Sequence, residues 1–181
     1  MARQQAGSAR RYAEALFPIA VERGAIEDWA AQLERIARVV EDPVAARVLA
    51  GPAATPDQKR RAVEALAGPL SREVLVLVGI LLDRKRVSVL PALAEAFAAR
   101  LREQRGIELA DVTTAVEIGD SERTLITERL AHQVGKQVEL RISVDPAIIG
   151  GVVVRVGDQL YDASVRGKLE RLRRSLSTSI N

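Results

Sequence analysis

The chain has 181 residues, which is enough for one full-sized domain or for two small ones with cores of their own. Hydrophobic residues make up 48% of it and indicate a globular protein, but aromatic residues make up only 3%, so the core must be aliphatic. Because there is no cysteine, disulfides, thiol catalysis and cysteine-ligated zinc are excluded. A net charge of +3, from 27 basic and 24 acidic side chains, is a weak sign of a nucleic-acid partner.

No stretch of the sequence is long and apolar enough to suggest a membrane span. The longest apolar run extends from Val74 to Leu82, whereas crossing a bilayer takes about 20 residues. The N-terminus lacks the apolar core of a signal peptide. Helical periodicity begins near Ala9, which leaves too little chain in front of it for a transit peptide. We therefore expect a soluble protein.

The first 106 residues have the three- and four-residue apolar spacing of helices throughout. Asp42 followed by Pro43 predicts a helix start, and Thr55-Pro56-Asp57-Gln58 is a capping box. Pro18 falls inside the first helix, where it should bend the helix or remove one hydrogen bond. Six helices are expected, at about residues 9–23, 26–40, 43–49, 56–67, 72–82 and 88–105.

From residue 107 the apolar period changes from 3.6 to 2, which indicates strands. A strand is expected over 107–118, with a bulge near Ala110-Asp111 where the alternation slips. A helix should follow from Asp120 to about Val134. Further strands are expected at 138–144 and 152–156, with a short one at Leu160-Tyr161 after a Gly157-Asp158 turn.

The last helix is expected to begin at Ser164 and to carry its apolar residues on one side. We therefore predict an α+β protein with an N-terminal six-helix bundle, residues 1–106, followed by a small α/β domain, residues 107–181. The second domain should contain a short mixed sheet and two helices.

The stretch VDPAIIGGVVVRVGDQLYDASVRGKLERL, residues 144–172, raises the question of a phosphate-binding loop. Gly167-Lys168 matches half of the G-x-x-x-x-G-K-[ST] pattern, but Asp162 and Leu169 stand where Gly and a hydroxyl residue are required. The Gly150-Gly151 pair precedes a strand instead of following one. We expect these glycines to supply backbone angles or close approach that a Cβ would block.

Asp158 and Asp162 offer two carboxylates for acid–base or metal chemistry. The only histidine, His132, is far from them in the sequence, and no serine lies in a G-x-S-x-G setting. Asp158 follows Gly in a predicted hairpin turn, and Asp162 precedes the last helix, where a carboxylate accepts backbone N–H groups. We therefore interpret both as structural and expect no catalytic residue, metal or cofactor.

Two surfaces remain for partner binding. The last helix carries Arg and Lys at 166, 168, 171, 173 and 174 against Glu170 alone, which fits a solvated face, an acidic protein partner or nucleic acid. The helix at 72–82 is apolar on every side, as in a bundle centre or beside a groove that receives a partner helix. Tyr12, Ala15 and Ile19 form a second apolar edge on the first helix.

The opening stretch also resembles the C-terminal signature of the delta subunit of F-type ATP synthases, the family of the mitochondrial oligomycin sensitivity-conferring protein. The segments ARRYAEALF near the N-terminus and RVSVLP at 86–91 are similar to that family as well, in the same order along the chain. The matching signature residues, which we expect to be structural, are Gly150, Gly151, Arg155, Gly157, Asp158, Asp162, Ser164, Arg166 and Gly167.

The resemblance implies a non-catalytic stator subunit without a cofactor, which resists rotor torque during proton-driven ATP synthesis. It implies that the first domain binds alpha subunits of the catalytic head and the second binds b subunits of the peripheral stalk. Location at the cytoplasmic face of a bacterial membrane follows, with membrane contact only through the complex. The alternative is a basic adaptor that binds nucleic acid. The implied alpha-subunit groove consists of Tyr12, Ala15, Leu16, Ile19, Val76 and Ile80.

Overall fold

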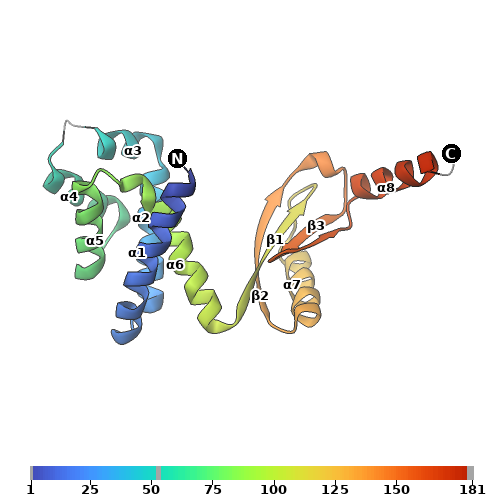
Figure 1. The fold of residues 1–181 in the computed structure, drawn as a ribbon, viewed down its shortest axis with the longest axis horizontal. Coiled ribbons are helices and arrows are strands. Elements are labelled where there is room, and N and C mark those ends of the chain that lie inside the picture. The colour runs from blue at the N-terminus through green and yellow to red at the C-terminus, as the bar shows by residue number, and fades with distance from the viewer. Residues whose placement is uncertain (1, 52–53, 179–181) are drawn as a thin grey trace. The chain divides into compact units, whose positions relative to one another are not determined.

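A computed structural model describes residues 2–51 and 54–178 of the chain. Within these residues the fold is α+β, with eight α-helices, two 3-10 helices and a four-stranded mixed sheet (Figure 1). The chain divides into two compact units, residues 1–101 and 102–181, which we call the helical unit and the sheet unit. Each unit has a hydrophobic cluster of its own.

Local capping signals set several helix ends in the helical unit. The Asp42 carboxylate accepts the backbone N–H groups of Val44 and Ala45, and Thr55 and Gln58 form the predicted capping box. The helices are α1 Ala2–Glu22, α2 Ile26–Glu41, α3 Pro43–Ala50, α4 Pro56–Ala67, α5 Arg72–Asp83 and α6 Leu90–Arg105, with the 3-10 helix η1 Val87–Val89 before α6.

The core of the helical unit is mostly aliphatic and surrounds two buried aromatic side chains, Trp29 and Phe97. The ring of Phe17 tilts against that of Phe97, with centroids 5.2 Å apart. On α1 the buried positions include Ala13 and Ala20, whose small side chains let neighbouring helices approach closely. An Ala-rich sequence with few aromatic residues therefore still forms a closed core.

The sheet unit begins with a strand–helix–strand segment and continues with a hairpin. Its strands lie in the order β2-β1-β3-β4, with β1 and β2 parallel and the other pairs antiparallel. Its elements are β1 Ile107–Thr114, α7 Asp120–Val134, β2 Gln137–Val144, the 3-10 helix η2 Pro146–Ile148, β3 Val152–Val156, β4 Gln159–Asp162 and α8 Val165–Thr178.

The α7 helix packs on one face of the sheet, where Leu130 meets Val112, Val154 and neighbouring apolar residues (Figure 1). The opposite face is polar and includes an Arg141–Asp111 ion pair of 2.5 Å across β1 and β2. One covered and one solvated face is the usual arrangement for a sheet that contains antiparallel strands.

The prediction of a bulge near Ala110-Asp111 is wrong. The β1 strand ends at Thr114 and pairs residue for residue with β2, with Ala110 opposite Leu140 and Asp111 opposite Arg141. The alternation slips because Leu109 is an apolar residue on the solvated face, next to Ala110 on the face that α7 covers. The apolar residues of β1 thus fall on both faces of the sheet, although the strand contains no extra residue.

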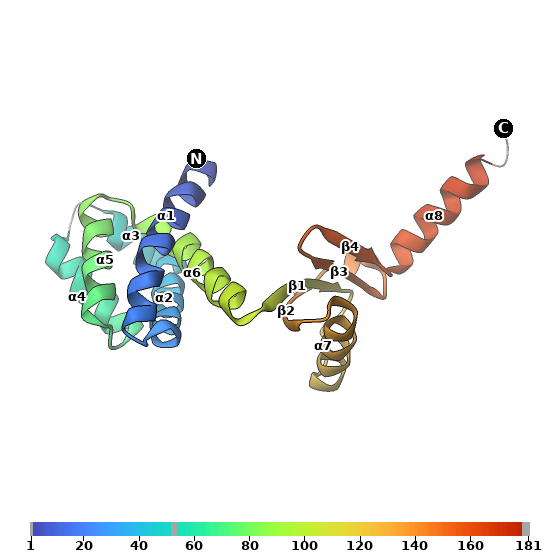
Figure 2. The ribbon, with the colours of Figure 1, turned by 60° about the horizontal axis from the view of Figure 1, so that its bottom comes forward.

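The apolar side of the last helix does not pack against a core, as an apolar stripe on a helix usually does. Val165, Leu169, Leu172 and Leu176 remain 39–58% exposed, although a stripe of this kind usually faces a core. The start of α8 is anchored to the rest of the sheet unit, where the Val165 N–H donates to the Gly150 carbonyl at 2.9 Å. The rest of the helix extends away from the sheet in both ribbon views (Figures 1 and 2).

Candidate functional site

A groove of about 510 Å3, lined mostly by residues of α1 and α5, lies on the helical unit. All six residues that the sequence singled out for partner binding line it. Sequence reasoning missed its remaining lining, which is partly charged and carries no apolar periodicity. The lining residues are Tyr12, Ala15, Leu16, Ile19, Arg23, Arg72, Glu73, Val76, Leu77 and Ile80.

The groove has an apolar floor and accessible apolar walls. Leu16 and Leu77 are buried beneath it, whereas Ile19, Val76 and Ile80 are 42, 56 and 41% exposed. The α5 helix thus satisfies the core with one face and presents Val76 and Ile80 on the other, which explains why its sequence is apolar all round. A clustered set of exposed aliphatic side chains on a monomeric unit indicates an interaction surface.

Hydrogen bonds from α2 hold the segment that leads into α5. Arg35 donates from Nε to the Ala67 carbonyl at 2.7 Å and from Nη2 to the Pro69 carbonyl at 3.0 Å. The buried Gln32 accepts the Ser71 backbone N–H through Oε1 at 2.7 Å. These bonds anchor the α4–α5 connection to α2 and so fix where α5 begins. The Ser71 side chain itself makes no cap hydrogen bond, although its position is typical of one.

Charged side chains lie at the rim of the groove. Arg23, in the turn directly after α1, and Glu73 on α5 form an ion pair of 3.5 Å that links the two walls. This pair is partly exposed, so we assign it to orientation of the rim more than to stability. Glu14 of α1 does not line the groove; hydrogen bonds from Arg10 and from Arg100 of α6 lower its pKa.

Pro18 lies within α1, which continues as a helix from Ala2 to Glu22. Proline lacks a backbone N–H, so the carbonyl of Glu14 loses the helical partner that it would otherwise have four residues later. Pro18 is exposed, while Leu16 and Ile19 beside it line the groove. The groove wall therefore keeps its helical course at this point.

The paired glycines at 150 and 151 have steric roles. Gly151 has a φ of +79°, and a Cβ there would lie 2.5 Å from the Ala163 carbonyl oxygen. A Cβ on Gly150 would lie 3.3 Å from the side chain of Val165. Both glycines let the segment before β3 pass close to the chain that enters α8. The prediction that they are structural agrees with this geometry.

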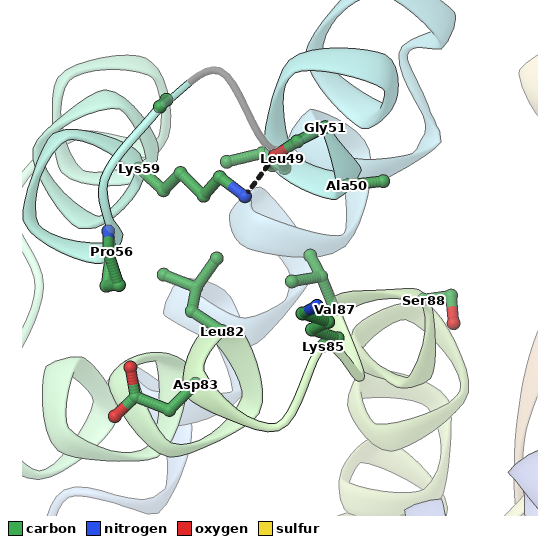
Figure 3. A pocket seen from close by; sticks show the side chains of 11 residues that line it. Leu49, Ala50, Gly51, Pro56, Lys59, Leu82, Asp83, Lys85, Val87 and Ser88 are labelled. Carbon is green, nitrogen blue, oxygen red and sulfur yellow. Dashed lines mark hydrogen bonds between the residues drawn. The ribbon is translucent and has the colours of Figure 1, made fainter.

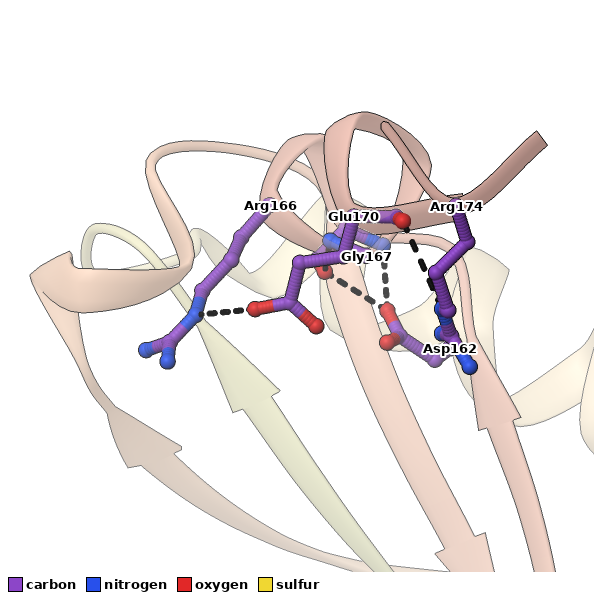
Figure 4. Close-up of polar contacts among 6 residues, drawn as sticks. Asp162, Arg166, Gly167, Glu170 and Arg174 are labelled. Carbon is purple, nitrogen blue, oxygen red and sulfur yellow. Dashed lines mark hydrogen bonds and ion pairs between the residues drawn. The ribbon is translucent and has the colours of Figure 1, made fainter. Parts of the chain in front are cut away.

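A compact hydrogen-bond network surrounds Asp162 at the start of α8 (Figure 4). Asp162 Oδ1 accepts from the Ser164 backbone N–H at 2.9 Å and from its hydroxyl at 2.6 Å, and these bonds lower the pKa of Asp162. The Ser164 hydroxyl oxygen in turn accepts the Gly167 N–H at 2.9 Å. A Cβ on Gly167 would overlap the Asp162 carboxylate. Asp162, Ser164 and Gly167 therefore form a helix cap.

The other signature residues lie in the hairpin and on α8. Gly157, with a φ of +56°, and Asp158 form the turn between β3 and β4. Arg155 is exposed on β3 opposite Asp111, so it does not share the backbone role of the glycines. The nearby Arg141 and Arg155 guanidinium groups lower the pKa of Asp111, the hydrogen bond from Arg141 being the larger cause. Arg166 pairs with Glu170 at 3.1 Å (Figure 4).

A second hollow, of about 590 Å3, lies between α3, α4 and α5 (Figure 3). Lys59 reaches across it and donates from Nζ to the Gly51 carbonyl at 2.6 Å. Asp83 is the one carboxylate among the described residues of the lining, so they offer no carboxylate pair for acid–base chemistry. Lys59 closes the end of α3, which is a structural role.

The described residues contain no group of three or more His, Cys, Asp or Glu side chains that could hold a metal ion. Among the same residues, no helix has the length and apolar character required to cross a bilayer. The features that stand out are therefore two surfaces, the α1/α5 groove and the exposed side of α8.

Comparison with known proteins identifies the class. The sequence pattern of the ATP synthase delta (OSCP) subunit family matches residues 9–176. The chain is 36% identical over 169 residues to ATP synthase subunit delta of Carboxydothermus hydrogenoformans, and 42% identical over 174 residues to that of Anaeromyxobacter sp.. Each alignment covers 93% of this chain and 96% of the relative.

The fold is also similar to a chain in the cryo-EM structure of the Toxoplasma gondii mitochondrial ATP synthase hexamer. The TM-score is 0.70 and the sequence identity 26%, over 93% of this chain and 96% of that one. These likenesses place the protein among the non-catalytic subunits of ATP synthases. The chain belongs to the ATP synthase delta (OSCP) subunit family. Family membership favours a role in the peripheral stalk over the nucleic-acid adaptor.

Proposed function

We propose that this chain is the stator subunit that joins alpha subunits of the catalytic head to b subunits of the peripheral stalk. By holding the head still, it resists rotor torque during proton-driven ATP synthesis. In this proposal the six helices α1–α6 act as one bundle that grips the head, and residues 107–181 hold the stalk. The α1/α5 groove is the observation that carries the proposal, because it presents accessible aliphatic walls above a closed floor.

An amphipathic helix is the occupant that suits this groove. Two parallel ridges of aliphatic side chains can receive the i, i+3, i+4 and i+7 positions of a helix laid between them. Each fully buried aliphatic side chain contributes roughly 1.5–3 kcal/mol. Association costs roughly 4–15 kcal/mol, so a single short helix binds weakly. A second contact through the sheet unit strengthens the attachment by raising the effective concentration at each site.

The bacterial relatives support a subunit that is peripheral to the cell membrane. We place it at the cytoplasmic face, where it contacts the membrane only through the rest of the complex. Binding through two protein surfaces requires no cofactor, and we assign none.

Ile80→Asp tests the groove. A carboxylate in the apolar wall should be poorly solvated once a partner helix covers it, which we expect to weaken binding to the catalytic head at least 100-fold. Co-sedimentation with purified heads measures the loss. Val44→Asp is the matched control, because Val44 is 71% exposed on α3 and does not line the groove.

Both variants should retain the helical content and unfolding midpoint of the parent protein, because both positions are exposed. Undiminished co-sedimentation of the Ile80 variant would show that the head binds elsewhere. Equal losses in the two variants would indicate a general effect of added negative charge.

A further inference from the structure

The exposed side of α8 has the spacing of a coiled-coil seam. Val165, Leu169, Leu172 and Leu176 follow one another at steps of four, three and four, which are the d, a, d and a positions of a heptad. All four side chains are 39–58% exposed, so the seam is unpartnered in this structure. We call these residues the α8 seam.

The residues that border the α8 seam lack acidic groups. In this heptad Arg166 and Arg173 occupy e positions, and Lys168 and Ser175 occupy g positions. Glu170, the one acid between 164 and 176, takes position b, away from the seam. Because e and g side chains meet those of the facing helix, the border selects a partner with Glu or Asp at its own e and g positions.

The same pattern disfavours the two other occupants of an apolar stripe. In a parallel pair of two copies of α8, Lys168 of one would face Arg173 of the other, and like charges at this border repel. A helix that lies in a lipid surface usually has a broader apolar face, with Trp or Phe at the interface. The α8 seam is a narrow a/d stripe without an aromatic residue.

The base of α8 is already ordered for such a contact. The Asp162–Ser164–Gly167 cap fixes its first turn, and Arg171 Nη2 donates to the Asp162 carbonyl at 3.3 Å. A helix that is formed before binding loses less conformational entropy when a partner arrives. The cap therefore has a consequence for binding as well as for the fold.

We propose that α8 forms one strand of a short coiled coil with an acidic heptad helix of a partner protein, through Val165, Leu169, Leu172 and Leu176. In identifying that partner with the peripheral stalk, this inference rests on the proposed function. The recognition chemistry itself, an aliphatic seam between basic borders, does not depend on the proposed function.

Two synthetic helices of three heptads test the chemistry on the full-length protein. Both carry Leu at a and d, one with Glu and the other with Lys at e and g. In fluorescence anisotropy the labelled Glu peptide should bind, and binding should weaken several-fold when salt rises from about 50 to 300 mM. The Lys peptide should bind at least 10-fold more weakly.

Neighbouring residues of α8 provide a matched pair of variants. Arg173→Glu changes the seam border, and Arg174→Glu makes the same charge change at position f, which faces away from the seam. We expect Arg173→Glu to weaken binding of the Glu peptide at least 10-fold, and Arg174→Glu to weaken it less than 3-fold. Leu172→Asp should abolish binding. Circular dichroism checks that the variants keep their helix. If Leu172→Asp unfolds, Leu172→Ala replaces it and should lower the affinity for the Glu peptide at least 10-fold.

Equal effects of Arg173→Glu and Arg174→Glu would overturn the proposal in favour of unspecific charge attraction. Failure of the Glu peptide to bind would also overturn the proposal. In that case, Leu172-dependent binding to phosphatidylglycerol vesicles would identify a lipid surface as the occupant of the seam, and Leu172-dependent dimerisation would identify a second copy of the protein. A pull-down with b subunits separates the two proposals. Undiminished capture by Leu172→Asp would refute the seam and leave the stator role intact. A bound Glu peptide without capture of b would refute the stalk assignment alone.

Discussion

At the scale of single residues, the signature region consists of backbone and capping chemistry. Asp162 was correctly predicted to accept backbone N–H groups, and its neighbours extend this role into the Asp162–Ser164–Gly167 cap. Sequence reasoning could not show that Gly167 is needed because the Asp162 carboxylate fills the space of its missing side chain. That contact brings together residues from β4 and α8, so only coordinates reveal it.

Gly151→Ala should destabilise the sheet unit strongly. Its positive φ and the 2.5 Å approach of a Cβ to the Ala163 carbonyl combine strain with overlap against backbone, so we expect a loss of about 2–4 kcal/mol. Gly157→Ala is the control, because it has a positive φ but open space, and should cost only about 1 kcal/mol. Urea unfolding followed by circular dichroism measures both; similar losses would contradict the steric argument.

The pKa of Asp162 is lowered by hydrogen bonds from Ser164, which makes the cap pH-dependent. A carboxyl with a lower pKa in the folded state stabilises the protein above its unfolded pKa of about 3.9, and loses that contribution as pH falls through the folded value. Asp162→Asn should therefore be less stable than the parent protein at pH 7, with a difference that shrinks below about pH 4. Urea midpoints between pH 2.5 and 7 provide the measurement, and a constant difference would refute this account.

At the scale of elements, two faces of α5 serve two purposes. Its pattern left a central helix and a groove wall as alternatives, and only packing shows that Val76 and Ile80 lie outside the core while Leu77 and Leu81 lie within it. A helix that is apolar on every side has no periodicity from which its orientation can be derived. Its placement depends on Gln32 and Arg35, polar residues of α2 that no motif identifies.

Arg35→Ala should weaken the helical unit by about 2 kcal/mol, because the part-buried carbonyl of Ala67 and the exposed carbonyl of Pro69 would lose a charged donor. Arg38→Ala serves as the control, because Arg38 is largely exposed and pairs with Glu34 on the same helix. It should cost no more than about 0.5 kcal/mol. The buried Trp29 reports unfolding of this unit by fluorescence, and equal losses would show that the loop anchor is unimportant.

At the scale of the whole molecule, the two candidate surfaces lie on different compact units, the α1/α5 groove on one and the α8 seam on the other. Each surface alone is small, and tight attachment follows when both are occupied together. In the proposed function, the subunit binds two partners through one chain and does no chemistry of its own.

Two-site attachment predicts a distinct result for single-site variants. Ile80→Asp should leave binding of the isolated subunit to b unchanged, and Leu172→Asp should leave binding to the head unchanged. Each variant should nevertheless dissociate about 100-fold faster than the parent protein from the assembled synthase, because effective concentration is lost. Release of labelled subunit after dilution measures this rate. Parent-like release by both variants would show that the groove and the seam do not act together.

The sequence by itself determined the class of fold, most element boundaries and the capping box at Thr55, because these follow from local periodicity and local hydrogen bonding. The six residues expected in the groove came from the resemblance to a family and not from the periodicity of α5. Tertiary structure decided the unbulged pairing of β1, the steric need for Gly151 and the exposure of the α8 seam. These depend on which distant segments approach one another. An amphipathic stripe has the same spacing whether its own chain or a partner covers it.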